Sequence, residues 1–297
     1  MIFSIMKRIR FIENSGNLPK EVVDKYQYQP MSQFIEMFLP QDSSYCVVPQ
    51  REEADICMYT IQHTDDSLLR DNELNIFFCI ENLRKNGRRG GMYAYYNKFG
   101  AYGSSKTDVF IMNDESKEVR QHDRTIIPVI HCRLSYYNRV QNDFAHLMTA
   151  KFEDKKFALF VSQSVLNKNK RPLFDMMSQY GTVDHIKMFP ELESVTCYNS
   201  VELLKLFNQY KFIITCENSH TNGYITEKIF NVFLSKSIAI YDGAPDIHEF
   251  IKPKCFIPLS PNLGRDIATI KDNKDLYNRI VGNDKIQDKY KDIKVTY

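Results

Sequence analysis

KFIITCENSHTNGYITEKIFNVFLSKSIAIYDG (211–243) is the stretch that decides the fold. Its two apolar runs, residues 211–216 and 237–243, are typical of buried strands, and residues 226–235 between them indicate a helix. A strand, a helix and a second strand in this order predict two parallel strands joined by a crossover helix. We therefore expect the polar residues between the first strand and the helix at one edge of a parallel sheet.

The same alternation recurs along the chain. Apolar runs without polar alternation indicate strands that are buried on both faces, so mainly parallel sheets covered by helices are expected. This predicts the α/β class, with two Rossmann-like, doubly wound domains. The other expected strands are residues 7–12, 44–49, 55–61, 74–80, 108–112, 125–130, 155–162 and 183–188, and the other expected helices are residues 19–39, 171–181 and 201–210.

The chain length predicts two domains. At 297 residues the chain exceeds the usual size of one domain, and two domains of roughly 150 residues each are expected. We place the boundary after residue 150, so that residues 1–150 and 151–297 each form one Rossmann-like domain. Residues 144–156 then form a helix or a linker at this boundary.

The composition argues against several classes of protein. Hydrophobic residues make up 43% of the chain and the net charge is only +2, as in ordinary globular proteins, so no nucleic-acid partner is expected. The seven cysteines are scattered and include no CxxC pair. Neither a disulfide framework nor a zinc site is therefore suggested.

The apolar runs are too short to cross a membrane. No stretch approaches the ~18 residues that a membrane-spanning helix needs, and the start MIFSIMKRIRFI has the pattern of a charged strand rather than a signal peptide. We therefore expect a soluble, cytoplasmic protein. Peripheral contact with a membrane, through Lys7, Arg8 and Arg10 or the Lys-rich tail, is left open.

The polar stretch CENSHTNGYITEK (216–228) has the composition and position of a ligand site. It begins at the carboxyl end of a strand and ends in the first turn of a helix, where open α/β sheets bind ligands. Thr226 is a good N-cap, and the free N–H groups of the turn that follows favour an anion. Lys228 adds a positive charge suited to a phosphate, while Glu227, which only accepts hydrogen bonds, suits sugar hydroxyls.

Three more side chains of this stretch, Asn218, Ser219 and Tyr224, could hydrogen-bond to the same ligand or stack on it. The alternative is that Glu227 and Lys228 are ordinary solvated residues of a first helical turn. No Walker lysine motif and no GxGxxG motif is present, which disfavours a nucleoside triphosphatase and a dinucleotide enzyme.

Two other expected strand ends carry candidate residues. In NKNKRPLFD (167–175), Arg171 could reach the same ligand, although a basic surface loop has the same pattern. In IFFCIENLR (76–84), Glu81 directly follows the most apolar run of the first half. A carboxylate that faces a cleft between domains would have its pKa raised by desolvation and could act as a general base. An exposed loop carboxylate is the alternative for Glu81.

Residues 216–245, CENSHTNGYITEKIFNVFLSKSIAIYDGAP, resemble the signature of the α1,3/α1,4-fucosyltransferases, which form glycosyltransferase family 10. That signature consists of F-E-N-S, a short variable loop, Y-[IV]-T-E-K and an apolar strand that ends near G-P. The likeness extends to KFALFVSQSVLNKNKRPLFDMMSQYG (156–181) and, in the first half, to IFFCIEN (76–82). It therefore covers most of the chain.

The resemblance implies the glycosyltransferase-B architecture, in which two Rossmann-like domains face a cleft. The N-terminal domain, residues 1–150, would bind the acceptor, and the C-terminal domain, residues 151–297, would bind GDP-fucose. The family inverts the anomeric centre in one displacement, with Glu81 implied as the base and Arg171 and Lys228 as the phosphate partners. The other donor contacts that it implies are Glu227, for a sugar or ribose hydroxyl, Asn218 and Tyr224.

The resemblance also bears on the metal requirement. An Arg and a Lys on a diphosphate replace the metal ion that other glycosyltransferases hold with a D-x-D motif, because both neutralise charge on the leaving group. No D-x-D motif is found at an expected strand end. We therefore expect no required cofactor, no metal site and a dispensable divalent ion.

The chain departs from the family pattern at several positions. Cys216 stands where the family usually has Phe, Asp242 stands where an aromatic residue is more usual, and the chain has no Trp. The chain looks more like the soluble bacterial or viral members than the anchored eukaryotic ones. His220 and Thr221 fall in the variable loop of the signature, where the resemblance gives them no role.

The resemblance predicts an inverting fucosyltransferase that moves L-fucose from GDP-fucose to a hydroxyl of an oligosaccharide acceptor. An α1,3 linkage to a sugar of the N-acetylglucosamine type is the expected product. The alternatives are a transferase for another GDP-linked deoxysugar and a catalytically inactive nucleotide-sugar or glycan-binding protein.

Overall fold

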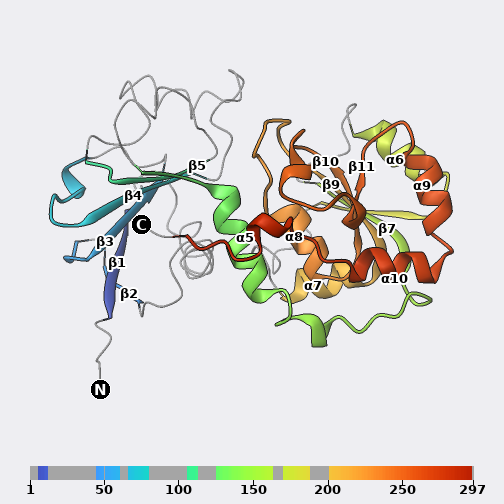
Figure 1. Ribbon diagram of the computed structural model, residues 1–297, viewed down its shortest axis with the longest axis horizontal. Helices are drawn as coiled ribbons and strands as arrows, with labels where there is room; N and C mark the ends of the chain where they lie inside the picture. The colour runs from blue at the N-terminus through green and yellow to red at the C-terminus, as the bar shows by residue number, and fades with distance from the viewer. Residues whose placement is uncertain are drawn as a thin grey trace. The chain divides into compact units, whose positions relative to one another are not determined.

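The computed structural model describes residues 6–12, 45–49, 51–60, 66–79, 106–112, 125–162, 170–187 and 201–295. The chain divides into two compact units (Figure 1). Unit 1 is Met1–Tyr136 with Ile293–Tyr297, and unit 2 is Tyr137–Asp292. The division falls within helix α5 (Val129–Val140). The expected limits of acceptor and donor domains, 1–150 and 151–297, stay predictions.

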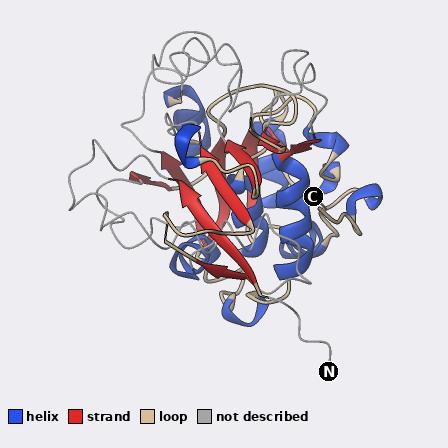
Figure 2. Cartoon of the chain, turned by 90° about the vertical axis from the view of Figure 1, so that its left-hand side faces the viewer, coloured by secondary structure: helices blue, strands red, loops and turns tan. Residues whose placement is uncertain are grey.

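Unit 1 contains a six-stranded parallel sheet, whose strands lie side by side in Figure 2. Its strand order is β2-β1-β3-β4-β5-β6. The strands are β1 (Lys7–Ile12), β2 (Tyr45–Val47), β3 (Ile56–Thr60), β4 (Leu74–Cys79), β5 (Val109–Met112) and β6 (Thr125–Pro128), with a 3-10 turn, η2 (Asp66–Leu68), before β4. Each strand lies within or close to its predicted range.

The core of this sheet explains why the apolar runs form strands. All four residues of β5 are buried, and successive strand residues point to opposite faces, so the strand is covered on both sides. Tyr59, Phe77 and Phe110 pack together on one face, with ring centroids 5.4 and 5.8 Å apart along the series. The predicted parallel sheet is thus confirmed in unit 1.

The prediction of a strand over residues 125–130 is wrong at its end. Strand β6 stops at Pro128, and α5 begins at Val129. Proline lacks the N–H that a sheet needs, and its fixed φ suits the start of a helix. The run TIIPVI is apolar throughout, which hid both the end of the strand and the helix that follows.

Unit 2 contains a five-stranded parallel sheet in the order β11-β10-β9-β7-β8. Its strands are β7 (Lys156–Ser162), β8 (Val183–Lys187), β9 (Tyr210–Cys216), β10 (Ile238–Asp242) and β11 (Ile257–Pro258). The order 8-7-9-10-11 reverses direction between β7 and β9, as in a doubly wound sheet. The carboxyl ends of these two strands are therefore the topological switch point, where such sheets bind ligands.

Helices cover this second sheet. Helix α6 (Arg171–Ser178), α9 (Leu263–Ile270) and α10 (Lys274–Gly282) share one core cluster with the strands. Helix α7 (Val201–Asn208) and α8 (Glu227–Leu234) pack on each other and on β9. Consecutive residues of β9 and β10 are buried, which requires cover on both faces. The short turns are η3 (Ala145–Leu147), η4 (Ile247–Glu249), η5 (Pro253–Cys255) and η6 (Asp288–Tyr290).

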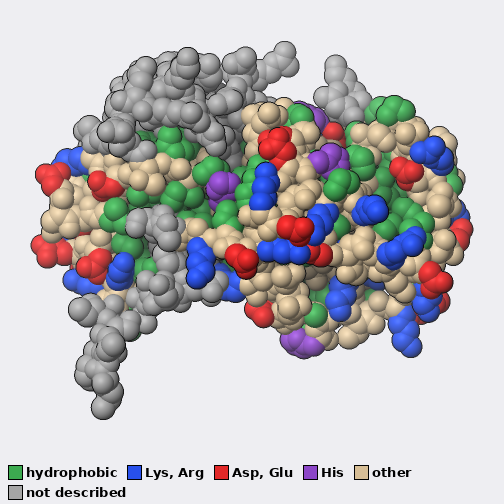
Figure 3. All heavy atoms as spheres, viewed as in Figure 1, with side chains coloured by type: hydrophobic (Ala, Val, Ile, Leu, Met, Phe, Trp, Pro, Cys, Tyr) green, Lys and Arg blue, Asp and Glu red, His purple; other side chains and the backbone are tan. Residues whose placement is uncertain are grey.

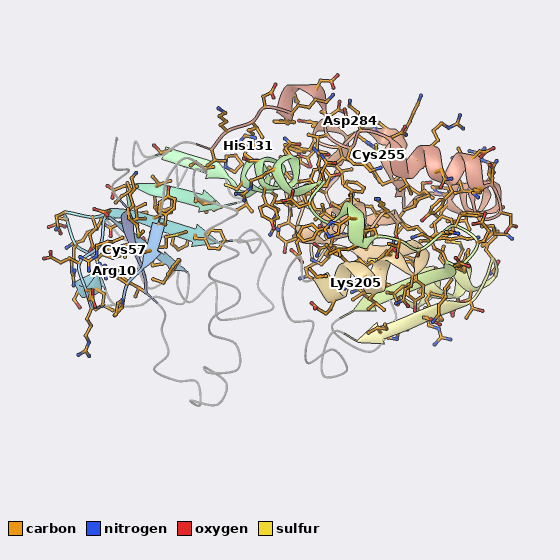
Figure 4. All side chains as sticks on the ribbon, turned by 90° about the horizontal axis from the view of Figure 1, so that it is seen from below. Arg10, Cys57, His131, Lys205, Cys255 and Asp284 are labelled. Carbon is orange, nitrogen blue, oxygen red and sulfur yellow. The ribbon has the colours of Figure 1, made fainter. Side chains whose placement is uncertain are left out.

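The segment after α10 folds back onto unit 2. Ile286 pairs with Ile251 in an antiparallel bridge, and the Tyr290 ring stacks on Phe250 with centroids 5.3 Å apart. The Cys255 thiol lies 3.1 Å from the Asp284 carbonyl oxygen, and both residues are labelled in Figure 4. The Lys-rich tail is therefore held through backbone pairing and ring stacking as well as through its charges.

The charged residues of the surface are mixed in sign. On the face shown in Figure 3, basic and acidic side chains are interspersed over unit 2. Within the described ranges, every helix is too short or too polar to span a bilayer.

A buried ion pair ties together the elements of unit 1. Arg10 on β1 and Glu73 before β4 both have fully buried side chains, and the Arg10 Nε donates to the two Glu73 oxygens at 3.0 and 2.7 Å. Glu73 also accepts from the Ala54 backbone N–H at 3.0 Å. Figure 4 shows Arg10 close to Cys57, whose thiol pKa is raised to about 12, mainly by burial. The pair therefore lies in the interior, where neither charge can be left alone.

We expect Glu73→Ala to lower the free energy of unfolding by about 3–5 kcal/mol, because it removes the buried carboxylate that compensates the charge of Arg10. Urea unfolding followed by circular dichroism measures this change. Glu52→Gln is the matched control, since its partner Arg8 is on the same strand but that pair is half exposed. The control should cost less than about 1 kcal/mol. Equal losses in the two variants would contradict a structural role for the buried pair.

Candidate functional site

The candidate site is the loop between β9 and α8, residues 217–226. It follows the carboxyl end of β9 at the switch point of the second sheet. The start of α6 follows β7, the neighbouring strand, so the loop and Arg171 come from adjacent strand ends. The topology therefore confirms the predicted position of the polar stretch at one edge of a parallel sheet.

Glu217 holds the end of this loop and the start of α8 through hydrogen bonds. Its side chain is fully buried, and its Oε1 accepts from the Thr226 N–H at 2.8 Å. Its Oε2 accepts from the Thr226 hydroxyl at 2.7 Å and from the Lys228 ammonium group at 3.0 Å. Lys228 also donates to the Thr226 hydroxyl oxygen at 2.8 Å. Thr226 is at the N-cap position, as predicted, but its side chain makes no capping hydrogen bond to α8. Instead it links Glu217 to Lys228.

The charge of Lys228 is maintained by its neighbours. Burial is the largest single influence and lowers its pKa, but the charges of Glu227 and Glu217 and the hydrogen bond to Glu217 outweigh burial and raise the pKa above the ordinary lysine value. The ammonium group is thus charged at neutral pH. Because the folded pKa is raised, the stability that this charge contributes is present below pH ~10.4 and is lost only as the pH rises through the folded pKa.

Two glycines let the loop take its shape. Gly223 has φ +72°, in the left-handed region, and its N–H donates to both carboxylate oxygens of Asp246 at 2.9 Å. At Gly243, a Cβ would lie 2.5 Å from Glu217 Cγ and 2.5 Å from the Tyr241 hydroxyl oxygen. A side chain at either position would disturb the loop, at Gly223 through the backbone and at Gly243 through the buried carboxylate.

The loop is also bound to the end of β10. The Glu217 N–H donates to the Asp242 carbonyl oxygen at 2.7 Å. The His220 Nε2 lies 2.7 Å from the Asp242 Oδ1, and the hydroxyls of Ser219 and Thr221 lie 3.0 Å apart. His220 and Thr221, which the sequence left without a role, therefore take part in the structure of the loop.

Four predicted donor residues lie in this region, with different exposure. Asn218 is exposed and Tyr224 is buried, with its hydroxyl near enough to contribute to the raised pKa of Lys228. Glu227 and Lys228 form an ion pair at 3.6 Å, and their side chains are 15% and 27% exposed. The loop thus carries Asn218 and Tyr224, and the first turn of α8 carries Glu227 and Lys228.

Arg171 pairs within its own helix. Its Nε donates to the Asp175 Oδ1 at 2.7 Å, and its guanidinium group lies over the Phe174 ring at 5.7 Å. The neighbouring Lys170 is near enough to influence the thiol pKa of Cys216, at the end of β9. The start of α6 is thus close to the loop, although the side chain of Arg171 is engaged elsewhere.

Cys216, which replaces the usual Phe of the family signature, is a neutral thiol. Burial is the main cause that raises its pKa, to about 11, and the charge of Asp242 adds to the effect. Its side chain packs against the core cluster of unit 2. The cysteine therefore takes a packing position, as an aromatic residue could.

Glu81, the predicted base, lies outside the described residues, as do Asn82 and the loop before Lys170. Glu217 is the important residue that the sequence reasoning missed. The signal was available, because a single acidic residue directly follows an apolar strand that must be buried. Within the described ranges no three His, Cys, Asp or Glu residues form a group that could hold a metal ion. The expectation that a divalent ion is dispensable stays a prediction.

The chain is similar to known proteins in sequence and in fold. Residues 148–281 match the family model described as Glycosyltransferase family 10 (fucosyltransferase) C-term. Alpha-(1,3)-fucosyltransferase FucT of Helicobacter pylori is 28% identical over 101 residues, which are 34% of this chain and 20% of that protein. GDP-fucose protein O-fucosyltransferase 3 of Danio rerio is 33% identical over 88 residues, which are 29% of this chain and 19% of that protein. These matches span a fifth or less of each relative's length.

The fold is shared along nearly the whole chain. A crystal structure of alpha1,3-fucosyltransferase with GDP-fucose aligns with 94% of this chain and 82% of its own, with a TM-score of 0.57 and 17% sequence identity. With its two doubly wound parallel sheets, the protein thus has the glycosyltransferase-B fold. Within that class, the segment 148–281 is similar to glycosyltransferase family 10, whose model is described as that of the fucosyltransferases.

We expect Glu217→Gln to lower the free energy of unfolding by about 2 kcal/mol, because the amide replaces one of the acceptor oxygens that Thr226 and Lys228 share. Urea unfolding measures the loss. Glu227→Gln is the matched control, because that carboxylate is partly exposed and its ion pair with Lys228 is longer, at 3.6 Å. The control should change stability by less than about 1 kcal/mol. A Glu217→Gln variant as stable as the wild type would show that the buried network is dispensable.

Proposed function

We propose that the protein is an inverting fucosyltransferase that moves L-fucose from GDP-fucose to a hydroxyl of an oligosaccharide acceptor. The observation that carries this proposal is the Lys228 ammonium group, held over the buried Glu217 at the start of α8 in a segment similar to family 10. A cytoplasmic location and an acceptor of the N-acetylglucosamine type are parts of the proposal.

The geometry of Lys228 supports a phosphate contact. An ammonium group has three N–H donors, and two of them are used by Glu217 and the Thr226 hydroxyl. The third can point to a ligand, since the side chain is 27% exposed. The N–H groups and the dipole at the start of α8 favour an anion at the same place. Glu227 beside it can accept hydrogen bonds from ribose or sugar hydroxyls.

The proposed reaction is a single displacement. The acceptor hydroxyl oxygen forms a bond to the anomeric carbon of fucose while the bond from that carbon to the β-phosphate oxygen breaks. Glu81 accepts the proton of the hydroxyl, and GDP leaves with the electron pair of the broken bond. Lys228, with Arg171 once its guanidinium group leaves Asp175, would stabilise the negative charge that develops on the diphosphate. The pair would thereby replace a metal ion.

The acceptor is the least constrained part of this proposal. The Helicobacter pylori relative is named for a sugar linkage, whereas the Danio rerio relative is named for a protein acceptor. An acceptor screen with GDP-fucose should therefore contain oligosaccharides and peptides. Thermal unfolding with GDP, GDP-fucose and GDP-mannose tests the donor before that screen. No shift with any of the three would reject the proposal, and a shift without turnover would favour an inactive binding protein.

We expect Lys228→Ala to weaken GDP binding by about 10- to 100-fold, the effect of losing one hydrogen bond to a charged group. Isothermal titration calorimetry measures the affinity, and a thermal unfolding curve verifies that the variant is folded. Lys205→Ala is the control, because Lys205 is an exposed lysine on α7. Unchanged GDP affinity in a folded Lys228→Ala protein would remove this lysine from the phosphate site.

We expect Glu81→Gln to reduce transfer by at least about 100-fold with donor affinity nearly unchanged, because an amide cannot accept the proton of the acceptor hydroxyl. Initial rates with GDP-fucose and the acceptor found by the screen give the loss in kcat, and calorimetry gives the donor affinity. Glu53→Gln, an exposed carboxylate of the same unit, is the control. A fully active Glu81→Gln variant would place the base at another residue.

A further inference from the structure

We propose that His220 and Asp242 form a couple that recognises hydroxyl groups of the donor sugar and so sets the choice between GDP-linked sugars. The inference rests on the proposed function, because it assumes that a GDP-sugar binds at the switch point of the second sheet. It gives a role to Asp242, which departs from the family signature, and to His220, which lies in the variable loop of that signature.

The two side chains meet although they are 22 positions apart in the sequence. Asp242 is the last residue of β10, and His220 belongs to the loop that follows the neighbouring strand β9. The His220 Nε2 and the Asp242 Oδ1 are 2.7 Å apart. Since a carboxylate only accepts hydrogen bonds, the Nε2 atom must be the donor. This fixes Nδ1 and Oδ2 as the other polar atoms of the couple.

The couple is accessible, unlike the Glu217 network. The His220 side chain is 59% exposed and that of Asp242 is 28% exposed. Neither the His220 Nδ1 nor the Asp242 Oδ2 has a hydrogen bond to the part of the chain that the structure describes. Exposed ion pairs contribute only about 0–1 kcal/mol to stability, so folding alone gives little reason for this arrangement. The couple presents polar atoms that can contact a ligand.

The couple belongs to the same strand-end cluster as the proposed phosphate site. The pKa of the Cys216 thiol is influenced by the charges of Asp242, Lys170 and Lys228, which places all three near this cysteine. The Asp242 carbonyl oxygen also accepts from the N–H of Glu217, the residue that binds Lys228. The couple is therefore within reach of a GDP-sugar whose diphosphate contacts Lys228.

The chemistry of the couple suits a sugar better than a phosphate. The carboxylate of Asp242 repels an anion, whereas a sugar hydroxyl can donate to Oδ2. With Nε2 protonated, a neutral His220 has an acceptor at Nδ1 for a second hydroxyl. Sites that hydrogen-bond a specific hydroxyl discriminate strongly against ligands that lack it, because their polar groups are then left unpaired. The couple thus has the properties of a specificity element.

The main alternative is that the couple only fastens the loop to β10. Asp242→Asn separates the two roles, because the amide oxygen can still accept from the His220 Nε2 while the Oδ2 acceptor becomes an NH₂ donor. A loop fastener would tolerate this change, whereas a sugar hydroxyl that donates to Oδ2 would lose its charged acceptor. His220→Ala removes both roles, and His146→Ala, at an exposed histidine in η3, is the matched control.

The experiment measures the affinities of the wild type and the three variants for GDP, GDP-fucose and GDP-mannose by isothermal titration calorimetry. In Asp242→Asn we expect GDP affinity within about twofold of the wild type and GDP-fucose affinity at least about tenfold lower, the loss of one hydrogen bond to a charged group. The preference for GDP-fucose over GDP-mannose should fall in Asp242→Asn and His220→Ala and persist in His146→Ala.

Two outcomes would overturn the inference. If GDP and GDP-fucose affinities fall in parallel in the Asp242→Asn and His220→Ala variants, the couple acts only by holding the loop. If neither affinity changes, the couple does not contact the sugar. In both cases the wild type still binds GDP-sugars, and the proposed function stands. A wild type that binds none of the three ligands would reject the proposed function, and this inference with it.

Discussion

The buried carboxylate of Glu217 is the constraint on which the site depends. A carboxylate without exposure to water must be fully hydrogen-bonded and paired with a positive charge. Thr226 and Lys228 meet both requirements, and they can do so only if α8 begins beside the end of β9. The geometry of the loop is thus tied to the burial of one charge. The same charge requires a glycine at position 243, where a Cβ would come within 2.5 Å of Glu217 Cγ.

The parallel sheet places this carboxylate at the edge where doubly wound sheets commonly bind ligands. In unit 2 the strand order changes direction between β7 and β9, so their connections leave on opposite faces and the strand ends stay open. The register pairs Cys216 with Asp242, so the residue that follows β9 lies next to the end of β10. Polar residues that follow apolar strands therefore lie at one edge of the sheet because the strands are parallel, whatever the sequence of the loop.

The fold could be read from the sequence because buried parallel strands are apolar throughout, and runs such as residues 211–216 and 108–112 have no other ready explanation. The start of helix α5 could not be predicted in this way. Its first residues continue the apolar run of β6, and only Pro128 marks the boundary between the two elements. The His220–Asp242 contact depends on the register of two strands, which local spacing does not contain. By contrast, the pairing of Arg171 with Asp175 has the spacing of one helical turn and could have been expected.

The charges around Lys228 bear on the proposed role of Arg171. Lys228 lies between two carboxylates, Glu217 and Glu227, so the three side chains together carry one net negative charge. The helix start favours an anion there, and a further cation such as Arg171 would offset the net negative charge of these three side chains. The Arg171–Asp175 pair is more than half exposed and contributes at most about 1 kcal/mol, so binding an anion can readily break it. If Arg171 takes the proposed role, its pairing with Asp175 is a resting contact that the anion would displace.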